Sequence, residues 1–137
     1  MTFAGCPLLW VSKLQTEVAL STTEAEATAL SQSMRELMPI KDLANEIVGS
    51  LRMKEKPKHD ALSAVFEDNN GALTLATVPK LTPRSKHIAA KHWFFREHVG
   101  RATRIVKVDA KKQKADTFTK ALPEKDFKNI QHLLCGW

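Results

Sequence analysis

Short apolar runs typical of strands alternate along this chain with longer segments of helical periodicity, and this alternation limits the possible folds most. Two runs rich in apolar and β-branched residues, 61–68 and 103–108, are predicted to be strands. Helical segments lie between them, so the two strands can pair in parallel through right-handed crossovers. The order predicts an α/β fold in which helices flank a mixed sheet.

The N-terminal third of the chain is predicted to contain a hairpin followed by two helices. Leu8–Val11 and Glu17–Leu20 are strand-like and form the expected hairpin. Pro39 interrupts the helical pattern after it, because proline lacks an amide hydrogen and its ring clashes with the preceding turn. We therefore expect helices at Thr22–Met38 and Ile40–Val48. Further helices are predicted at 72–77, 86–99, 114–122 and 124–134.

The composition is that of an ordinary soluble globular domain, with 43% hydrophobic and 26% charged residues in 137. One domain with a modest core suits this length. No apolar stretch is long enough to span a membrane, and the N-terminus lacks the basic region of a signal peptide. Cys6 and Cys135 have no metal-binding spacing, so we expect free thiols in a reducing compartment.

Positive charge is concentrated in one segment of the chain. The formal net charge is +6, yet residues 80–114 contain eleven lysines and arginines against only Glu97 and Asp109. This segment therefore carries a formal charge of +9, and the rest of the chain is negative. A basic segment on a folded domain indicates a polyanionic partner, although a solvated basic face fits the charge equally well.

Three carboxylates stand where they could form a metal site. Asp68 ends a hydrophobic strand, Glu26 shares a helix side with Leu30, and Asp116 begins a short helix after the last strand. Converging carboxylates repel one another without cations between them, and their oxygens are the ligands that Mg²⁺ and Mn²⁺ prefer. Each residue also has a structural interpretation, as a helix cap, a turn residue or a helix start.

Three ordered blocks of this sequence carry a more specific signal: "WVSKLQTEVALSTTEAEATALSQSMRE", "DNNGALTLATVPKLTPRSKHIAAKHWFFREHV" and "QKADTFTKALP". Together they resemble the C-terminal ribonuclease H domain of Ty1/copia-type retrotransposon polyproteins. The resemblance covers nearly the whole chain, and it implies a ribonuclease H-like fold. It also implies that Glu26 is the catalytic glutamate, followed by Ala29 and Leu30 at the expected spacing, whereas Glu24 pairs with Ser21 as a helix cap.

The resemblance implies hydrolysis of the RNA strand in RNA–DNA hybrids during reverse transcription. Glu26, Asp68 and Asp116 would hold two Mg²⁺ or Mn²⁺ ions, one to position the attacking water and one to stabilise the leaving oxygen. The expected partners are an RNA–DNA hybrid and the reverse transcriptase portion of the polyprotein. The expected location is a cytoplasmic virus-like particle or the nucleus. The residues expected to contact nucleic acid are Arg84, Lys86, His87, Lys91 and Arg96.

The sequence also departs from the family pattern. The family's first strand carries a fourth acid, in a motif like D-A-D-W-A, which no residue here matches. We therefore expect residues 1–137 to form a partial domain that lacks the first strand and most of the second. Its ribonuclease activity should be weak or absent, and its exposed sheet edge could support self-association. The alternative is a catalytically inactive retroelement remnant that acts as a basic nucleic-acid-binding module.

Overall fold

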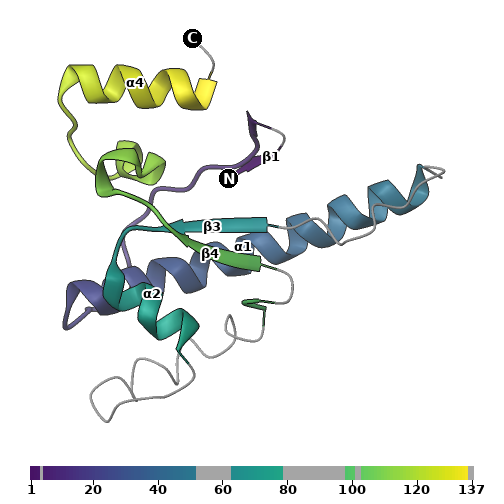
Figure 1. Cartoon of the computed structure of the whole chain (residues 1–137), viewed down its shortest axis with the longest axis horizontal. Coiled ribbons are helices and arrows are strands. Elements are labelled where there is room, and N and C mark those ends of the chain that lie inside the picture. Colours follow the sequence, from purple (N-terminus) through teal and green to yellow (C-terminus); the bar gives the residue numbers. More distant parts are fainter. Residues whose placement is uncertain (4, 52–62, 79–97, 101–102, 136–137) are drawn as a thin grey trace. The chain divides into compact units, whose positions relative to one another are not determined.

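The computed structural model describes residues 1–3, 5–51, 63–78, 98–100 and 103–135, which fall into two compact units. The first, here called the central unit, lies within residues 19–107; the terminal unit combines residues 1–18 with the chain from 108 onward (Figure 1). The central unit contains α1 (Thr22–Ser50), β3 (Ser63–Glu67), α2 (Asn70–Thr77) and β4 (Thr103–Lys107). The terminal unit contains β1 (Thr2–Phe3), β2 (Cys6–Pro7), the 3₁₀ helices η2 (Ala110–Lys112) and η3 (Lys114–Phe118), and α4 (Glu124–Cys135).

The central unit is built on a parallel pair of strands, as the sequence predicts. β3 pairs with β4 in register from Ser63 opposite Thr103 to Glu67 opposite Lys107. The hydroxyl groups of Ser63 and Thr103 lie 2.9 Å apart at the start of this pair. Alternation along β3 directs Val65 and Glu67 to one face and leaves Phe66, which is 55% exposed, on the other.

The predicted break at Pro39 is wrong, because α1 runs without interruption from Thr22 to Ser50. Pro39 is exposed, so the Arg35 carbonyl group that loses its amide partner can be hydrated. Proline's fixed φ is itself helical, and the cost of one missing hydrogen bond is offset by packing on both sides of it. Met34 is fully buried before Pro39, and Lys41 is buried after it.

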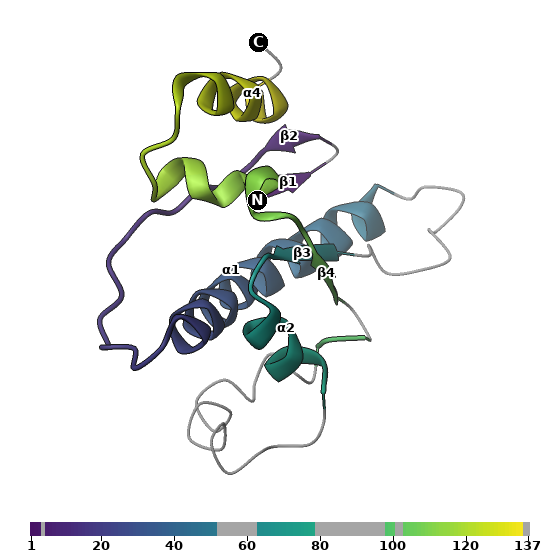
Figure 2. The same ribbon diagram turned by 60° about the vertical axis from the view of Figure 1, so that its left-hand side comes forward.

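Helix α1 packs against the face of the β3–β4 pair that carries Val65, and its apolar residues form the core. Leu30 and Met34 of α1 are buried together with Ala76 of α2. The partly buried residues around them come from α1, both strands and the segment before β4: Leu37, Met38, Val65, Val99 and Ile105. Figure 2 shows α1, α2 and the two strands of this unit from a second direction. A small core therefore holds together the strands and helices that the structure describes in the central unit.

Small residues allow the first turn of α2 to approach the first turn of α1 closely. A Cβ atom added at Gly71 would lie 2.4 Å from the Thr23 hydroxyl oxygen, well inside van der Waals contact. Ala27 of α1 and Ala72 of α2 are also buried at this end of the two helices. The absence of a side chain at Gly71 thus sets how near the end of β3 lies to the beginning of α1.

The terminal unit differs from its prediction at the N-terminus. The hairpin joins β1 to β2 through a turn in which Gly5 has φ +84°, rather than Leu8–Val11 to Glu17–Leu20. Of the first predicted run, Leu8 and Leu9 bond to the backbone of Met1 beside this hairpin. Neither run forms a strand among the described residues, and apolar side chains alone do not form a ladder. The Ser12 hydroxyl group instead donates to the Phe118 carbonyl oxygen at 2.9 Å, tying this segment to η3.

The remaining expectations have mixed outcomes. Helix α4 and the short helix α2 confirm their predictions, whereas the predicted helix at 114–122 is a 3₁₀ turn, η3. The expected single mixed sheet is replaced, in the described ranges, by an antiparallel pair and a parallel pair. Most of the predicted helix 86–99 lies outside the described residues. Among the helices that the structure describes, none combines the length and apolar character that crossing a membrane requires.

Candidate metal centre

Ser21 is the N-cap of α1, and Glu24 pairs with it, as the sequence predicts. The Ser21 hydroxyl group accepts the Glu24 amide hydrogen at 3.2 Å, and a Glu24 carboxylate oxygen accepts the Leu20 amide hydrogen at 2.9 Å. The first bond satisfies an amide group that a helix start leaves without a partner, and the second ties the preceding segment to the first turn. Because Glu24 has this role, Glu26 is the acid of the pair that can serve another purpose.

Glu26 lies next to two consecutive acids at the carboxyl end of β3. Ligand oxygens of Glu26, Glu67 and Asp68 all lie within 4.8 Å of one another. Glu67 is buried, with 5% of its surface exposed, whereas Glu26 and Asp68 are half-buried. These three residues are called the acidic cluster below. The structure thus brings together two of the acids predicted from the sequence and adds a third, Glu67.

The spacing and chemistry of the acidic cluster fit a divalent cation. Mg²⁺ binds carboxylate oxygens at about 2.1 Å, so two oxygens on opposite sides of one ion are roughly 4 Å apart. The oxygens of the cluster lie within 4.8 Å of one another, which is close to this separation. Hard carboxylate oxygens without sulfur or imidazole ligands favour Mg²⁺ or Mn²⁺ over zinc.

The local hydrogen bonds fix the orientation of the end of β3. The Asn69 amide group donates to a Glu67 carboxylate oxygen at 2.8 Å. The Asn69 side chain then caps α2 by accepting the Gly71 and Ala72 amide hydrogens at 2.8 and 3.0 Å. One residue therefore holds both the buried carboxylate and the start of the following helix.

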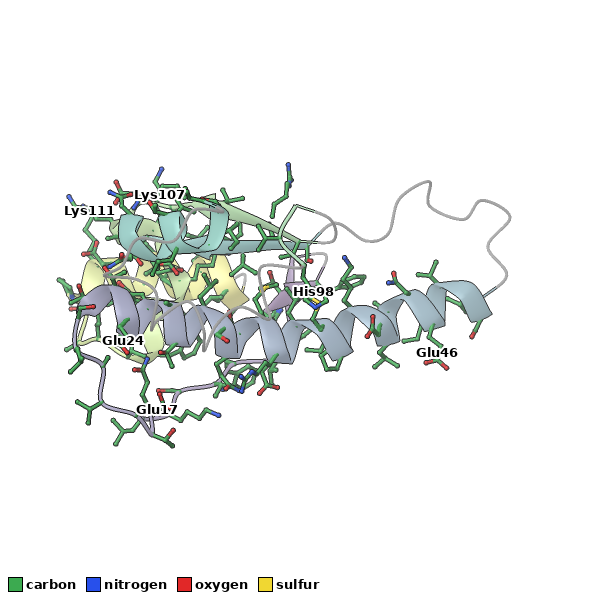
Figure 3. The ribbon with its side chains drawn as sticks, turned by 90° about the horizontal axis from the view of Figure 1, so that it is seen from below. Glu17, Glu24, Glu46, His98, Lys107 and Lys111 are labelled. Carbon is green, nitrogen blue, oxygen red and sulfur yellow. The ribbon has the colours of Figure 1, made fainter. Side chains whose placement is uncertain are left out.

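Lys107 is the one cation recorded beside the acidic cluster in the described chain. Its ammonium group donates to the Asp68 carbonyl oxygen across the β3–β4 pair. Three carboxylates against this one ammonium leave a formal excess of two negative charges, which a divalent cation would balance. Figure 3 labels Lys107 together with Glu24 at the start of α1.

The environment of Glu67 favours its neutral form. Burial raises the pKa of the Glu67 carboxyl group above its usual value of 4.5, and the charges of Glu26 and Asp68 raise it further. The Asn69 hydrogen bond and the Lys107 charge act in the opposite direction without cancelling the shift. A bound cation would replace this unfavourable charge crowding by direct coordination.

Asp116, the third predicted acid, belongs to the terminal unit. It lies in η3, and its carboxylate accepts a hydrogen bond from the Lys120 ammonium group at 2.8 Å. Lys120 lies beyond the end of η3, four residues after Asp116. The role of Asp116 as a metal ligand stays a prediction.

The predicted nucleic-acid contacts all fall outside the described residues. They are Arg84, Lys86, His87, Lys91 and Arg96, within the range 79–97. Their assignment rests on the sequence resemblance alone and stays a prediction.

Glu67 was not among the predicted site residues, although the sequence indicates its position on the core-facing side of the strand. In a strand, residues two apart share a face, so Val65 in the core implies that Glu67 lies on the same face. The prediction instead took only Asp68, the last residue of the expected strand 61–68. Burying a carboxyl group at the core-facing end of a strand costs free energy. A cation bound between Glu67 and the neighbouring carboxylates would offset this cost.

Replacing Glu67 by glutamine should stabilise the metal-free chain at neutral pH. Because the pKa of Glu67 is raised, the folded state binds its proton more tightly than the unfolded state does. Stability is then highest below the usual pKa and declines as the pH rises through the raised value. The glutamine variant should lack this decline. Urea unfolding measured from pH 4 to pH 8 in EDTA tests this.

The matched control for this prediction is Glu46→Gln, at an exposed glutamate of α1 labelled in Figure 3. It should leave the pH dependence unchanged. A Glu67→Gln variant that is less stable than the wild-type chain at pH 7 in EDTA would contradict the interpretation.

Comparison with known proteins shows that this chain is similar to retrovirus-related Pol polyproteins of plant transposons. It is 32% identical over 134 residues to that of transposon TNT 1-94 from Nicotiana tabacum, an alignment covering 97% of the chain and 9% of the polyprotein. The polyproteins of transposons RE1 and RE2 from Arabidopsis thaliana are each 36% identical over 125 residues, covering 90% of the chain and 8% of each polyprotein. The chain thus spans about a tenth of the length of these homologues, which support a retrotransposon protein. No family model and no solved structure matches it.

Proposed function

We propose that this chain is a ribonuclease H-like segment of a copia-type retrotransposon polyprotein, which acts on RNA–DNA hybrids. The observation that carries the proposal is the acidic cluster at the carboxyl end of a parallel strand pair. Glu26 and Asp68 of this cluster also occupy the family-like blocks of the sequence. The similarity to Pol polyproteins supports the same assignment, because reverse transcription produces such hybrids.

In the proposed reaction, Glu26, Glu67 and Asp68 would hold a divalent cation. A ligand role for Asp116 rests on the sequence resemblance alone. Bound Mg²⁺ or Mn²⁺ ions would activate water and stabilise the leaving oxygen of the RNA strand. Asn69 positions Glu67 through its amide group. Lys107 offsets part of the negative charge before a cation binds. The partners would be an RNA–DNA hybrid and the reverse transcriptase portion of the polyprotein.

A second candidate function is nucleic-acid binding without catalysis. The net charge of +6 favours it, since this charge accumulates in the basic segment. The first-strand aspartate of the family also has no counterpart in residues 1–137, so the ligand set proposed here omits one family acid. Binding of a hybrid would then persist although cleavage does not.

Cleavage of a labelled RNA–DNA hybrid in Mg²⁺ and then in Mn²⁺ tests the proposed function. We expect slow, cation-dependent cleavage of the RNA strand, below the rate of an intact ribonuclease H. Glu26→Gln should reduce this cleavage to background, because it removes a negatively charged ligand. Glu24→Gln should retain it, since glutamine also serves in a capping box.

Three results distinguish the alternatives. Cleavage that persists in Glu26→Gln or in EDTA would contradict the proposed metal centre. Hybrid binding without cleavage in either metal would favour the non-catalytic module. Cleavage lost equally in Glu24→Gln and Glu26→Gln would indicate that the start of α1, rather than one carboxylate, is what the reaction needs.

A further inference from the structure

Two lysines of the terminal unit neutralise acids four residues before them in the chain. The Lys120 ammonium group lies 2.8 Å from the Asp116 carboxylate, and the Lys128 ammonium group lies 2.6 Å from the Glu124 carboxylate. Both pairs join residues four apart along the chain. These ammonium groups are therefore already matched by a negative charge.

The lysines around η2 differ in their surroundings. Lys114 is half-buried, and its ammonium group donates to the Leu133 carbonyl oxygen at 3.3 Å in the last turn of α4. A cation at a helix C-terminus is a structural contact. Lys111 and Lys112 are exposed, and neither side chain has a hydrogen-bond or ion-pair partner among the described residues.

The backbone of η2 holds these two lysines on a closed turn. The Asp109 carboxylate accepts the Lys111 amide hydrogen at 2.9 Å, and the Asp109 carbonyl oxygen accepts the Lys112 amide hydrogen at 2.8 Å. Asp109 thus binds the amide groups of the turn, and within the described part of the chain it makes no contact with an ammonium group. Figure 3 labels Lys111. The turn fixes the backbone while both side chains stay hydrated.

We propose that Lys111 and Lys112 contact the phosphate backbone of bound nucleic acid. Identifying the polyanion as an RNA–DNA hybrid rests on the proposed function. Exposed ammonium groups bind phosphates by releasing condensed counterions, so the contact requires neither burial nor base recognition. Three lysines within residues 111–114 give this turn the local charge density that such binding needs. These lysines differ from the contacts predicted between residues 84 and 96.

Helix α4 supplies a control of equal charge. Lys125 lies between Glu124 and Asp126, and Lys128 pairs with Glu124, so this surface is locally balanced. A Lys125→Gln/Lys128→Gln variant removes the same two positive charges as Lys111→Gln/Lys112→Gln. A comparison of the two double variants therefore distinguishes the effect of the position of the charges on binding from the effect of the net charge.

The test is fluorescence anisotropy of a labelled RNA–DNA hybrid with the full chain in EDTA, between 50 and 300 mM salt. Each phosphate contact contributes about −0.9 to the slope of log affinity against log salt. Lys111→Gln/Lys112→Gln should therefore make the slope less negative by about 1.8, and weaken binding at 0.1 M salt by roughly tenfold or more. The control variant should keep the wild-type slope.

The outcomes separate this inference from the proposed function. Equal losses in both double variants would overturn it, because net charge alone would then explain binding. A wild-type chain that does not bind the hybrid would overturn it as well. A changed slope in a chain that cleaves no hybrid in Mg²⁺ or Mn²⁺ would support the phosphate contact and contradict the proposed catalysis.

Discussion

Met34→Ala is expected to lower the free energy of unfolding by about 2–5 kcal/mol. The Met34 side chain is fully buried and lies in the core cluster with Leu30 and Ala76. Its removal takes away apolar contacts and leaves a cavity that rigid neighbours from β3 and β4 cannot fill. Stability differences of this size are a large share of the total for a small domain. Urea unfolding followed by circular dichroism measures the effect.

Leu43→Ala is the matched control for Met34→Ala. Leu43 belongs to the same helix and loses a side chain of similar size, but it is 56% exposed. Its replacement should cost less than about 1 kcal/mol, because little buried area is lost. If the two variants were destabilised equally, the core would not lie where α1 meets the strand pair.

The fold of the central unit was largely predictable, because its signals are local. The strand runs at 61–68 and 103–108 have the composition of parallel strands, and the structure pairs them in parallel. The capping box at Ser21 identifies the start of α1 to within one residue. Capping and periodicity depend on neighbours only a few residues apart, which the sequence displays directly.

The errors arose where packing overrides local preference. Pro39 disfavours a helix locally, yet buried residues on both sides of it keep α1 continuous. The apolar run at Leu8–Val11 has strand propensity, but it forms no strand in the part of the chain that the structure describes, although Leu8 and Leu9 bond to the Met1 backbone. For α1, the core contacts with β3 and β4 are distant in sequence, so propensity could not reveal them.

Two of the three residues of the acidic cluster were predicted from the sequence. Glu26 and Asp68 were chosen from the sequence, and they lie together in the structure. Glu67 was not predicted, because an acid beside a turn is usually solvated. Its burial depends on which face of β3 it occupies, and the prediction from the sequence did not assign that face. Its burial became evident only when Val65 was placed in the core.

Cations that bind the acidic cluster should stabilise the folded chain, and this effect should depend on Glu26. A ligand that binds only the folded state adds about 2.7 kcal/mol when its concentration is 100 times its dissociation constant. The pKa of Glu67 is raised chiefly by burial and further by repulsion from Glu26 and Asp68, and Mn²⁺ binding would relieve this repulsion. Glu26→Gln removes one charged oxygen ligand from the cluster, so most of the stabilisation should disappear.

Glu24→Gln provides the control for this effect. It makes the same chemical change two residues away, at the cap of α1. Glutamine can accept the same amide hydrogen, so the helix start should persist. The stabilisation by Mn²⁺ should then match that of the wild-type chain.

The most direct test of the acidic cluster as a metal centre is the unfolding free energy of three chains, with Mn²⁺ and with EDTA. The account predicts a Mn²⁺-dependent increase in the wild-type chain and in Glu24→Gln, and little or none in Glu26→Gln. An equal increase in all three chains, or none in the wild-type chain, would show that Glu26, Glu67 and Asp68 do not form a metal centre.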